Sequence, residues 1–422
     1  MGTEKLAAGS GSSVVVERCQ VCDHPDLVES LFLGFLPPVN EMIKMGVRPH
    51  EQAAYPAQWL YCPRCQLVQL GLTVDPQILF PPEYPYTSGT TKILRDNFAE
   101  LYQETSSLIK LTPQDLAIDI GSNDGTLLSN FKKGGHRVHG IEPTDMGKLA
   151  NSRGIKTSIA YFGKEIATKV RAEENGATVI TATNVFAHIE NVHEIVKSIL
   201  ILLDEKKGVF ISESHYLMSL LETLQYDTIY HEHLRYYSLH SIKYLLEMHG
   251  LEIFHAKRIP THGGSIRVYS ARKGTQTILP SVDQILTEEK KVGVDVKRLD
   301  DFKMRVVNSK LELYSLLTDI KKKGQRIYGI GAPSRASTLI NYVGLDDGIL
   351  DCVLEVKGSY KTGKYMPGTI IPCIEEDRLF SDQPDYALLL SWHIAEELMP
   401  KLKQKGYKGK FIVPLPTPTI HS

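Results

Sequence analysis

The chain has 422 residues, which is more than a single hydrophobic core usually organises, so we expect two or three domains. Its 48 basic side chains are balanced by 49 acidic ones, and the formal net charge of -1 argues against nucleic acid as a partner, because phosphate binding needs a concentrated positive field. No apolar run is long enough to span a bilayer, and residues 1–13 form a polar tail without the apolar core of a signal peptide, so we expect a cytoplasmic protein without a membrane partner.

The texture of the chain changes twice along its length. Residues 1–80 combine the tail, which we expect to be disordered, with a segment rich in turns, prolines and cysteines. Residues 81–275 alternate short apolar stretches with helical patterns, which predicts an α/β domain with a parallel sheet. Residues 276–422 begin with a charged stretch whose apolar residues recur at helical spacing, and we expect one long connecting helix with one packed face. A second strand–turn–helix series follows from Gln325.

Four of the six cysteines form two C-x2-C pairs, Cys19 with Cys22 and Cys62 with Cys65. Each pair places two sulfur atoms on one tight turn, and two such turns close a tetrahedral shell around Zn2+. In a reducing compartment this pattern indicates metal ligands rather than disulfides, although four unrelated buried thiols or a redox pair would also explain it. Four thiolates leave no open coordination position, so the predicted zinc is structural.

The segment 116–128 (LAIDIGSNDGTLL) predicts a buried strand, a sharp glycine turn and the start of a helix. Glu142 ends the next predicted strand, where a carboxylate can accept both hydroxyls of a ribose. A dinucleotide-binding turn usually reads G-x-G-x-x-G, whereas this turn reads G-S-N-D-G. Its acidic Asp124 would repel a pyrophosphate but suits the ammonium of a methionine moiety. The sequence therefore favours S-adenosylmethionine over a dinucleotide, and an ordinary turn without a ligand is the alternative.

Two more polar residues follow a later strand of the same region. The segment 178–192 (TVITATNVFAHIENV) predicts a strand that ends close to Asn184 and His188, and ligands bind at such carboxyl ends in doubly wound sheets. Phe162 follows the third strand pattern, so it either lines an adenine pocket or belongs to the core. The candidate cofactor-binding residues are Asp119, Gly121, Asn123, Asp124, Gly125, Glu142, Phe162 and Asn184.

The densest group of reactive side chains is Tyr230, His231, Glu232 and His233. In an extended segment the two histidines would share one face and the other two residues the opposite face, whereas a loop would not obey this alternation. The histidines lack H-E-x-x-H spacing, so the group does not predict a catalytic metal. Near neutral pH, histidine is the natural proton acceptor and a tyrosine hydroxyl can donate to a carbonyl oxygen.

Two flanking segments add candidates. Tyr84 and Tyr86 precede the first strand of the central region, where many methyltransferases fold a lid over the cofactor, so we expect a functional role for one of them. The paired glycines of HGGS (262–265) indicate a close approach of the backbone to substrate or to another strand, which makes His262 a candidate substrate-binding residue.

Together these segments resemble the sugar C-methyltransferases of deoxysugar biosynthesis, which make C-3-branched sugars. The matching segments, in order over nearly the whole chain, are the C-x2-C at Cys19, CPRCQLVQL, EYPYTSGTT, IDIGSNDGTLL, NVFAHIENV, YHEHLRYYSLHS, HGGSIRV, YGIGAPSRASTLIN and KTGKYMPGTIIP. The resemblance implies a small zinc-binding N-terminal domain, a central Rossmann-like domain that binds S-adenosylmethionine, and a C-terminal Rossmann-like α/β domain.

The resemblance also implies a reaction. The substrate would be a nucleoside-diphosphate 4-keto-deoxysugar (dTDP or GDP), held between the central and C-terminal domains and methylated at C3 through an enolate. His233 matches the proposed base, Glu232 would orient it, and Tyr230 or His188 would hydrogen-bond the keto oxygen. Tyr84 is carried over with these four as a catalytic candidate.

The C-terminal region departs from the family pattern at two positions. Arg335 stands where lysine is frequent, and Glu355 stands in a turn where aspartate is common. Arg335, Lys361 and Lys364 are candidates for the diphosphate, with Tyr86 and His262 as further substrate contacts, although each lysine also suits a solvated surface.

Three other functions are compatible with parts of the sequence. An O- or N-methyltransferase acting on a related nucleotide sugar or natural product needs no base that forms an enolate. A nicotinamide-dependent sugar dehydrogenase or epimerase needs a glycine fingerprint that is absent at Gly121 and only partial in GIGAPSR (329–335). A zinc-ribbon adaptor would not explain the group at 230–233. The sequence does not determine the oligomeric state, and we expect a monomer.

Overall fold

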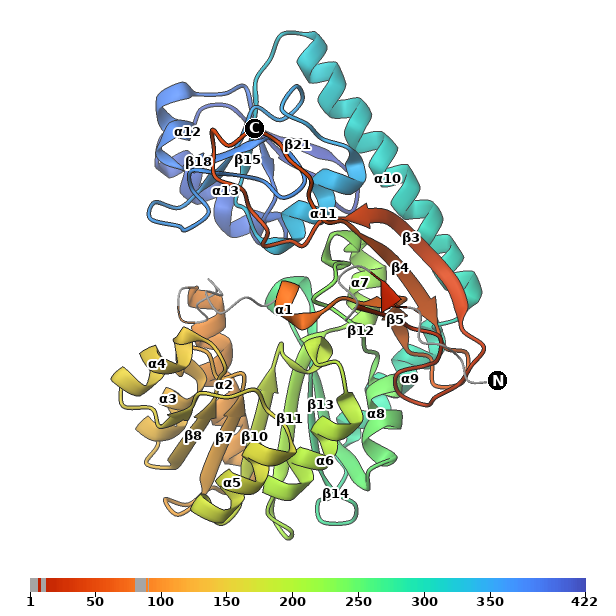
Figure 1. Ribbon diagram of the computed structural model, residues 1–422, viewed down its shortest axis with the longest axis vertical. Helices are drawn as coiled ribbons and strands as arrows, with labels where there is room; N and C mark the ends of the chain where they lie inside the picture. The colour runs from red at the N-terminus through yellow and green to blue at the C-terminus, as the bar shows by residue number, and fades with distance from the viewer. Residues whose placement is uncertain (1–6, 9–12, 80–88, 90) are drawn as a thin grey trace.

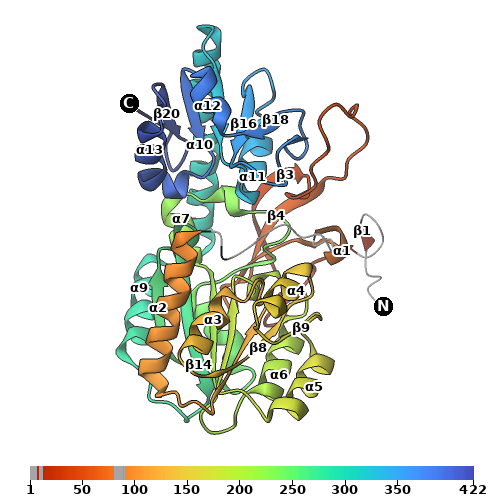
Figure 2. The same ribbon diagram turned by 90° about the vertical axis from the view of Figure 1, so that its left-hand side faces the viewer.

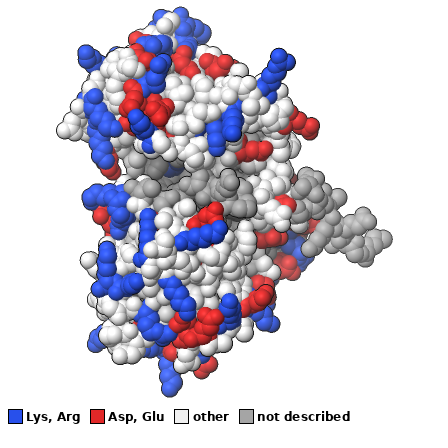
Figure 3. Space-filling view, turned by 60° about the vertical axis from the view of Figure 1, so that its left-hand side comes forward, with Lys and Arg blue, Asp and Glu red and all other residues white. Residues whose placement is uncertain are grey.

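A computed structural model describes residues 7–8, 13–79, 89 and 91–422. It has two α/β lobes, with the N-terminal strands placed between them and beside the long helix α10, Val296–Lys322 (Figure 1). Basic and acidic side chains are interspersed over both lobes on the face shown in Figure 3. None of the described helices is long and apolar enough to cross a membrane.

The N-terminal strands form two small antiparallel sheets. One has the order β12-β5-β4-β3, and its edge strand β12 comes from the central part of the chain, where Arg235 pairs with Gln69. The buried Trp59 explains how this sheet is anchored, because its ring lies 4.8 Å from Tyr236 and stacks at 5.5 Å on Phe302 of α10. The elements are β3 (Val28–Leu36), β4 (Tyr55–Tyr61), β5 (Val68–Leu70) and β12 (Arg235–Tyr236), with β1 (Ala7–Ala8), β2 (Ser13–Val15), β6 (Leu72–Thr73) and α1 (Pro76–Leu79) beside them.

The lower lobe contains a seven-stranded sheet of order β13-β14-β11-β10-β7-β8-β9. β14 runs in the direction opposite to the other six strands, and every residue of the central strand β7 is buried, as expected for a sheet with helices on both faces (Figure 2). The strand order reverses between β7 and β10, which makes that edge the expected ligand position. The strands are β7 (Leu116–Ile120), β8 (Arg137–Ile141), β9 (Thr157–Ser158), β10 (Val179–Thr183), β11 (Val209–His215), β13 (Leu251–Ile259) and β14 (Ser265–Arg272). The helices are α2 (Lys92–Ile109), α3 (Thr126–Lys133), α4 (Asp145–Ser152), α5 (Lys164–Glu174), α6 (Val192–Leu202), α7 (Leu217–Thr223) and α8 (Leu239–Glu247).

The upper lobe has a second seven-stranded sheet, with the order β17-β18-β16-β15-β19-β20-β21. Its five inner strands are parallel and its two edge strands are antiparallel, so the lobe is a second Rossmann-like domain. The elements are β15 (Ile327–Ile330), α11 (Ser334–Val343), β16 (Cys352–Glu355), β17 (Lys364–Tyr365), β18 (Pro372–Glu375), α12 (Asp377–Asp382), β19 (Tyr386–Leu389), α13 (Ala395–Gln404), β20 (Lys410–Val413) and β21 (Thr419–His421).

The connecting helix differs from the prediction. The expected single helix is two, α9 (Pro280–Val292) and α10, because Gly293 adopts a φ of 75° that ends the first. Asp295 then caps the second by accepting a hydrogen bond from the Arg298 amide at 2.8 Å. The backbone carbonyl of Val294 accepts a hydrogen bond from Tyr61 at 2.7 Å, so the break is also tied to the N-terminal sheet.

Candidate active site

The four predicted zinc ligands lie together. Their sulfur atoms are all within 4.8 Å of one another, with 3.4 Å from Cys19 to Cys65 and 3.4 Å from Cys22 to Cys62. A tetrahedron with Zn–S bonds of about 2.3 Å has S–S edges of about 3.8 Å, so the cluster fits the ion. All four cysteines are buried, which suits a structural ion rather than one that exchanges ligands with substrate.

Both cysteine pairs use the same backbone turn. The residue after each pair, Asp23 or Gln66, has a φ of 57°, and its amide donates to the carbonyl of the first cysteine of the pair. Each turn therefore folds back on its own first cysteine and directs two thiols to one point. The local sequence therefore explains the shape of each half of the site.

The predicted cofactor turn is formed as expected at the carboxyl end of β7. Gly121 has a φ of 68°, and a Cβ there would lie 2.5 Å from Val185 in the loop after β10. Asn123 and Asn184 also have positive φ, in the turns after β7 and β10, and asparagine tolerates this conformation better than most residues. The two turns thus meet where the strand order reverses.

The acidic residues of this region differ in surroundings. Glu142 is buried and accepts hydrogen bonds from the Asn123 amide at 3.0 Å and from the Thr144 amide and hydroxyl at 3.0 and 2.6 Å. A carboxylate offers about four acceptor positions, so Glu142 keeps capacity for a ribose hydroxyl. Asp119 is buried and accepts a hydrogen bond from the Thr181 hydroxyl at 2.6 Å. Burial, then the nearby Glu142 and Glu213, raises the pKa of Asp119 to about 7.

Asp124 has partners that account for it without a ligand. Its carboxylate accepts hydrogen bonds from the Thr126 amide and hydroxyl at 3.2 and 2.6 Å, at the start of α3, and pairs with Arg153 at 2.9 Å. Its predicted contact with a methionine ammonium stays a prediction. Phe162 is half-buried and packs against the main hydrophobic core, so both of its expected roles remain open.

The segment 230–233 is a turn and not a strand, since the His233 amide donates to the Tyr230 carbonyl at 2.9 Å. Its three consecutive polar residues point to different parts of the protein. His231 contacts the N-terminal sheet, 3.3 Å from the Pro56 carbonyl, and Glu232 accepts a hydrogen bond from Asn40 at 2.7 Å. His233 faces a group of aromatic rings in the central domain. The alternation expected for an extended segment is therefore absent.

His233 has the geometry of a proton acceptor. Its Nδ1 lies 2.8 Å from the Thr228 carbonyl, and because a carbonyl only accepts, Nδ1 carries the hydrogen and Nε2 carries the lone pair. Burial, reinforced by His188, lowers the pKa of His233 well below 6.5. The ring centroid lies 4.1 Å from that of Tyr230 and 5.0 Å from that of His188. Three of the predicted catalytic residues are thus in contact.

Two further histidines, which the sequence did not single out, extend this group. The His215 ring lies 4.8 Å from His233 and 5.6 Å from His262, and burial lowers the pKa of His262 to about 4. Burial, then the nearby Arg335 and His262, lowers the pKa of His393. His215 ends β11 and His393 follows β19, so the rule that ligands meet strand ends would have found both.

Arg335 is held by the central domain. Its guanidinium donates to both carboxylate oxygens of Asp227, at 2.8 and 2.9 Å, and to Gln225 at 3.0 Å. The Trp392 indole donates to the same Asp227 carboxylate at 2.7 Å, so two residues of the upper lobe close on one carboxylate of the lower lobe. Arg335 is buried, and the Asp227 carboxylate balances the positive charge of its guanidinium.

The remaining substrate candidates divide into two sets. Lys361 donates to the Ala332 carbonyl at 2.5 Å, and burial lowers its pKa. Lys364, in strand β17, places its Nζ 4.9 Å from the centre of the Tyr360 ring. Tyr84 and Tyr86 lie outside the described residues.

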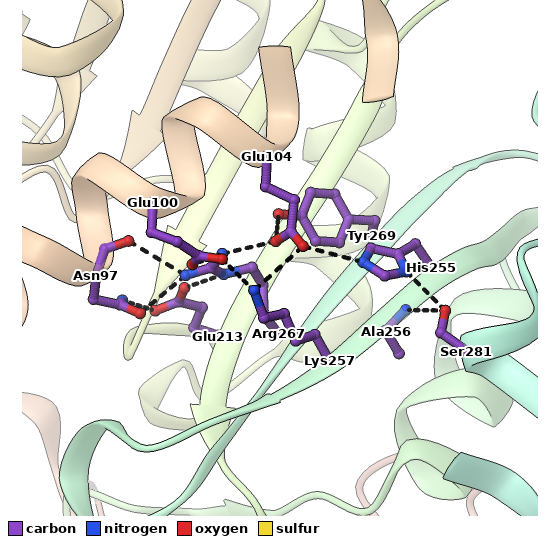
Figure 4. Close-up of polar contacts among 10 residues, drawn as sticks. All are labelled: Asn97, Glu100, Glu104, Glu213, His255, Ala256, Lys257, Arg267, Tyr269 and Ser281. Carbon is purple, nitrogen blue, oxygen red and sulfur yellow. Dashed lines mark hydrogen bonds and ion pairs between the residues drawn. The ribbon is translucent and has the colours of Figure 1, made fainter. Parts of the chain in front are cut away.

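A buried polar network fixes the helix that follows this undescribed segment (Figure 4). Arg267 of β14 donates to Glu213 of β11 at 2.5 Å, and both side chains are fully buried. The same guanidinium reaches Glu100 at 2.6 Å and Glu104 at 2.9 Å on α2. Helix α2 is therefore held against the sheet beside the cofactor turn by charge as well as by apolar packing.

Comparisons with known proteins agree with this arrangement. Three family models match the chain in order: a zinc binding domain at residues 19–80, a methyltransferase domain at 94–256 and a C-methyltransferase C-terminal domain at 260–416. The C-methyltransferase NovU of Streptomyces niveus is 31% identical over 411 residues, which cover 96% of this chain and 97% of that protein. The chain belongs to the C-methyltransferase family. It is an S-adenosylmethionine-dependent C-methyltransferase with a four-cysteine zinc site.

Solved structures of other methyltransferases are more distant. An S-adenosylmethionine-dependent methyltransferase from Anabaena variabilis is 18% identical, with 45% of this chain and 88% of that chain covered and a TM-score of 0.34. The magnesium protoporphyrin IX methyltransferase ChlM from Synechocystis, with bound S-adenosylmethionine, is 14% identical, with 42% and 78% covered and a TM-score of 0.31. Membership of the C-methyltransferase family makes carbon the methyl acceptor, so the O- and N-methyltransferase alternatives are set aside.

Proposed function

We propose that this C-methyltransferase methylates C3 of a nucleoside-diphosphate 4-keto-deoxysugar, with His233 as the base. A sugar carbon is a poor nucleophile, but a neighbouring ketone allows its proton to be removed as an enolate. S-adenosylmethionine, when bound, would supply the electrophilic methyl group that C3 takes up, with S-adenosylhomocysteine as the leaving group and the 4-keto group restored.

The fixed tautomer of His233 is the observation that supports this proposal most. The hydrogen bond from Nδ1 to the Thr228 carbonyl leaves the Nε2 lone pair to take a proton, and the lowered pKa keeps the ring unprotonated near neutrality. The other histidine of this segment, His231, instead contacts the Pro56 carbonyl of the N-terminal sheet. The proton from C3 would therefore go to His233.

The neighbouring residues suit the developing negative charge on the keto oxygen. Burial and the nearby Glu232 raise the pKa of Tyr230 well above 10, so its hydroxyl keeps its hydrogen and can donate it. His188, whose pKa burial lowers to about 4, is a neutral ring that can also donate from one nitrogen. We assign these two residues to the keto oxygen.

The position between the lobes supports a nucleotide sugar as substrate. Glu355, at the end of β16, accepts a hydrogen bond from the Ala332 amide at 2.9 Å, as Glu142 at the end of β8 accepts one from Asn123. Both sheets thus present a carboxylate at the end of the second strand of a Rossmann-like unit, the position that recognises a ribose. We propose that the lower lobe binds the cofactor and the upper lobe binds the nucleotide, with Lys361 and Lys364 near the diphosphate.

The test is methylation of a thymidine- or guanosine-diphosphate 4-keto-deoxyhexose, followed by mass spectrometry and by NMR of the sugar. The wild-type protein should add one methyl group at C3, and His233→Asn should abolish this while leaving cofactor affinity unchanged. A methyl group elsewhere on the sugar, or full activity of His233→Asn, would contradict the proposal.

A further inference from the structure

A long loop of the N-terminal domain contacts the upper lobe as well as its own sheet. This loop, residues 37–54, joins β3 to β4 and is called the strap here. The Met45 amide donates to the Gly363 carbonyl at 2.9 Å, and the Tyr365 amide donates to the Ile43 carbonyl at 2.8 Å. The strap therefore adds a short antiparallel pairing to the edge strand β17 of the C-terminal sheet.

The strap also reaches the segment 230–233. Asn40 donates a hydrogen bond from Nδ2 to Oε1 of Glu232 at 2.7 Å. Its Oδ1 accepts one from the Tyr360 hydroxyl at 3.5 Å. Glu232 is buried, and it follows His231, whose ring lies against Tyr55 where the strap ends. From residues 19–80 the sequence predicted a structural zinc site and no contribution to the reaction.

We propose that Asn40 is a positioning residue for this C-methyltransferase: it holds the Glu232 carboxylate near Tyr230, whose ring lies beside that of His233, and so couples the zinc-bearing domain to methyl transfer. This inference rests on the proposed function of the segment 230–233. A buried carboxylate needs donors to remain charged and in place, and the Asn40 amide supplies one from a different domain. The strap can hold Asn40 there because both of its ends are in the zinc-bearing sheet and its middle pairs with β17.

The other groups around Glu232 define what a substitution changes. Tyr230 belongs to the same segment, while Tyr360 and Lys361 come from the turn after β16, and all three interact electrostatically with Glu232. Replacing Asn40 with alanine removes a neutral donor and leaves these charges unaltered. Replacing it with aspartate instead puts a second carboxylate at hydrogen-bond distance from Glu232, and two such carboxylates cannot both ionise at the same pH as an isolated one.

The experiment compares Asn40→Ala and Asn40→Asp with the wild-type protein, using the full chain, bound zinc and a nucleoside-diphosphate 4-keto-deoxyhexose. Glu41→Ala is the matched control, because Glu41 is the next residue of the strap and is exposed. We expect kcat of Asn40→Ala to fall about 10- to 100-fold, as for the loss of a hydrogen bond to a charged group, with zinc content and cofactor affinity unchanged. Asn40→Asp should recover activity relative to the wild type as the pH is lowered, since the shared proton restores the hydrogen bond.

Two results would overturn the inference. One is a kcat of Asn40→Ala within about twofold of Glu41→Ala; the other is a ratio of Asn40→Asp to wild-type activity that does not change with pH. A purely structural role for Asn40 would lower stability without the pH signature. Absence of methylation by the wild-type protein would instead contradict the proposed function, so the two failures are distinguishable.

Discussion

Replacing Arg267 with methionine should destabilise the lower lobe strongly, because it leaves a carboxylate buried without its cation. Arg267 and Glu213 lie directly opposite each other on the antiparallel strands β14 and β11, and neither side chain is exposed (Figure 4). Removing one member of such a pair costs about 3–5 kcal/mol, mostly from the charge left behind. We expect a loss of this size in the free energy of opening of β11, β14 and α2.

The effect should depend on pH in a defined direction. Burial raises the pKa of Glu213, and Arg267 opposes that rise. Replacing Arg267 with methionine should therefore raise the pKa of Glu213 further. Between the ordinary pKa of a glutamate, near 4.5, and the raised pKa of Glu213, the folded variant holds a proton that the unfolded chain has released. The stability of the variant therefore falls as the pH rises. The difference between wild type and variant should therefore be larger at pH 8 than at pH 5.

Hydrogen exchange resolved by mass spectrometry is the suitable assay, because a chain with several domains need not unfold in one step. Lys257→Met is the matched control: it removes a half-exposed cation from the same network and should cost less than about 1 kcal/mol. The double variant Arg267→Met/Glu213→Gln should regain part of the loss. A destabilisation by Arg267→Met no greater than that by Lys257→Met would refute the reasoning.

Three further predictions concern the zinc site, the S-adenosylmethionine site and the proposed base. Cys62→Ser should lose zinc, measured by metal analysis, and expose the N-terminal sheet to proteolysis, whereas Cys352→Ser, at a buried cysteine outside the cluster, should keep the metal; retention of zinc by Cys62→Ser would contradict the four-thiolate site. Glu142→Gln should raise the dissociation constant for S-adenosylmethionine about 10-fold or more in calorimetry, and the exposed Glu165→Gln should not; equal affinities would remove Glu142 from the ribose. Because the pKa of His233 lies well below 6.5, kcat/KM should stay level as the pH falls through 6.5, and an acid limb centred at or above 6.5 would argue against this residue as the base.

The sequence predicts those parts of the fold and site that depend on neighbouring residues. The two cysteine turns, the strand Leu116–Ile120 and the turn at Gly121 are confirmed, since each depends on a short pattern with a steric or coordination requirement. The break at Gly293 was missed because the apolar spacing continues across it, and the contact of Val294 with the N-terminal sheet, which helps to stabilise it, comes from a distant part of the chain.

Contacts between distant segments could not be predicted in the same way. The pairing of Arg335 with Asp227, more than a hundred residues away in the sequence, was not predicted, and the expected contact of Arg335 with a diphosphate stays a prediction. Asn40 lies 192 positions from Glu232, and no local pattern marks either as the partner of the other. Such pairs follow from how the domains are packed, which periodicity and motif spacing do not encode.

Exchange of the substrate C3 proton with solvent tests the central claim most directly. The protein would be incubated in heavy water with a nucleoside-diphosphate 4-keto-deoxyhexose and S-adenosylhomocysteine, so that proton removal is observed without methyl transfer. The account predicts deuterium at C3 with the wild-type protein and none with His233→Asn. Exchange that persists in His233→Asn would contradict His233 as the base, and absence of exchange and of methylation in the wild-type protein would contradict the enolate route on this substrate.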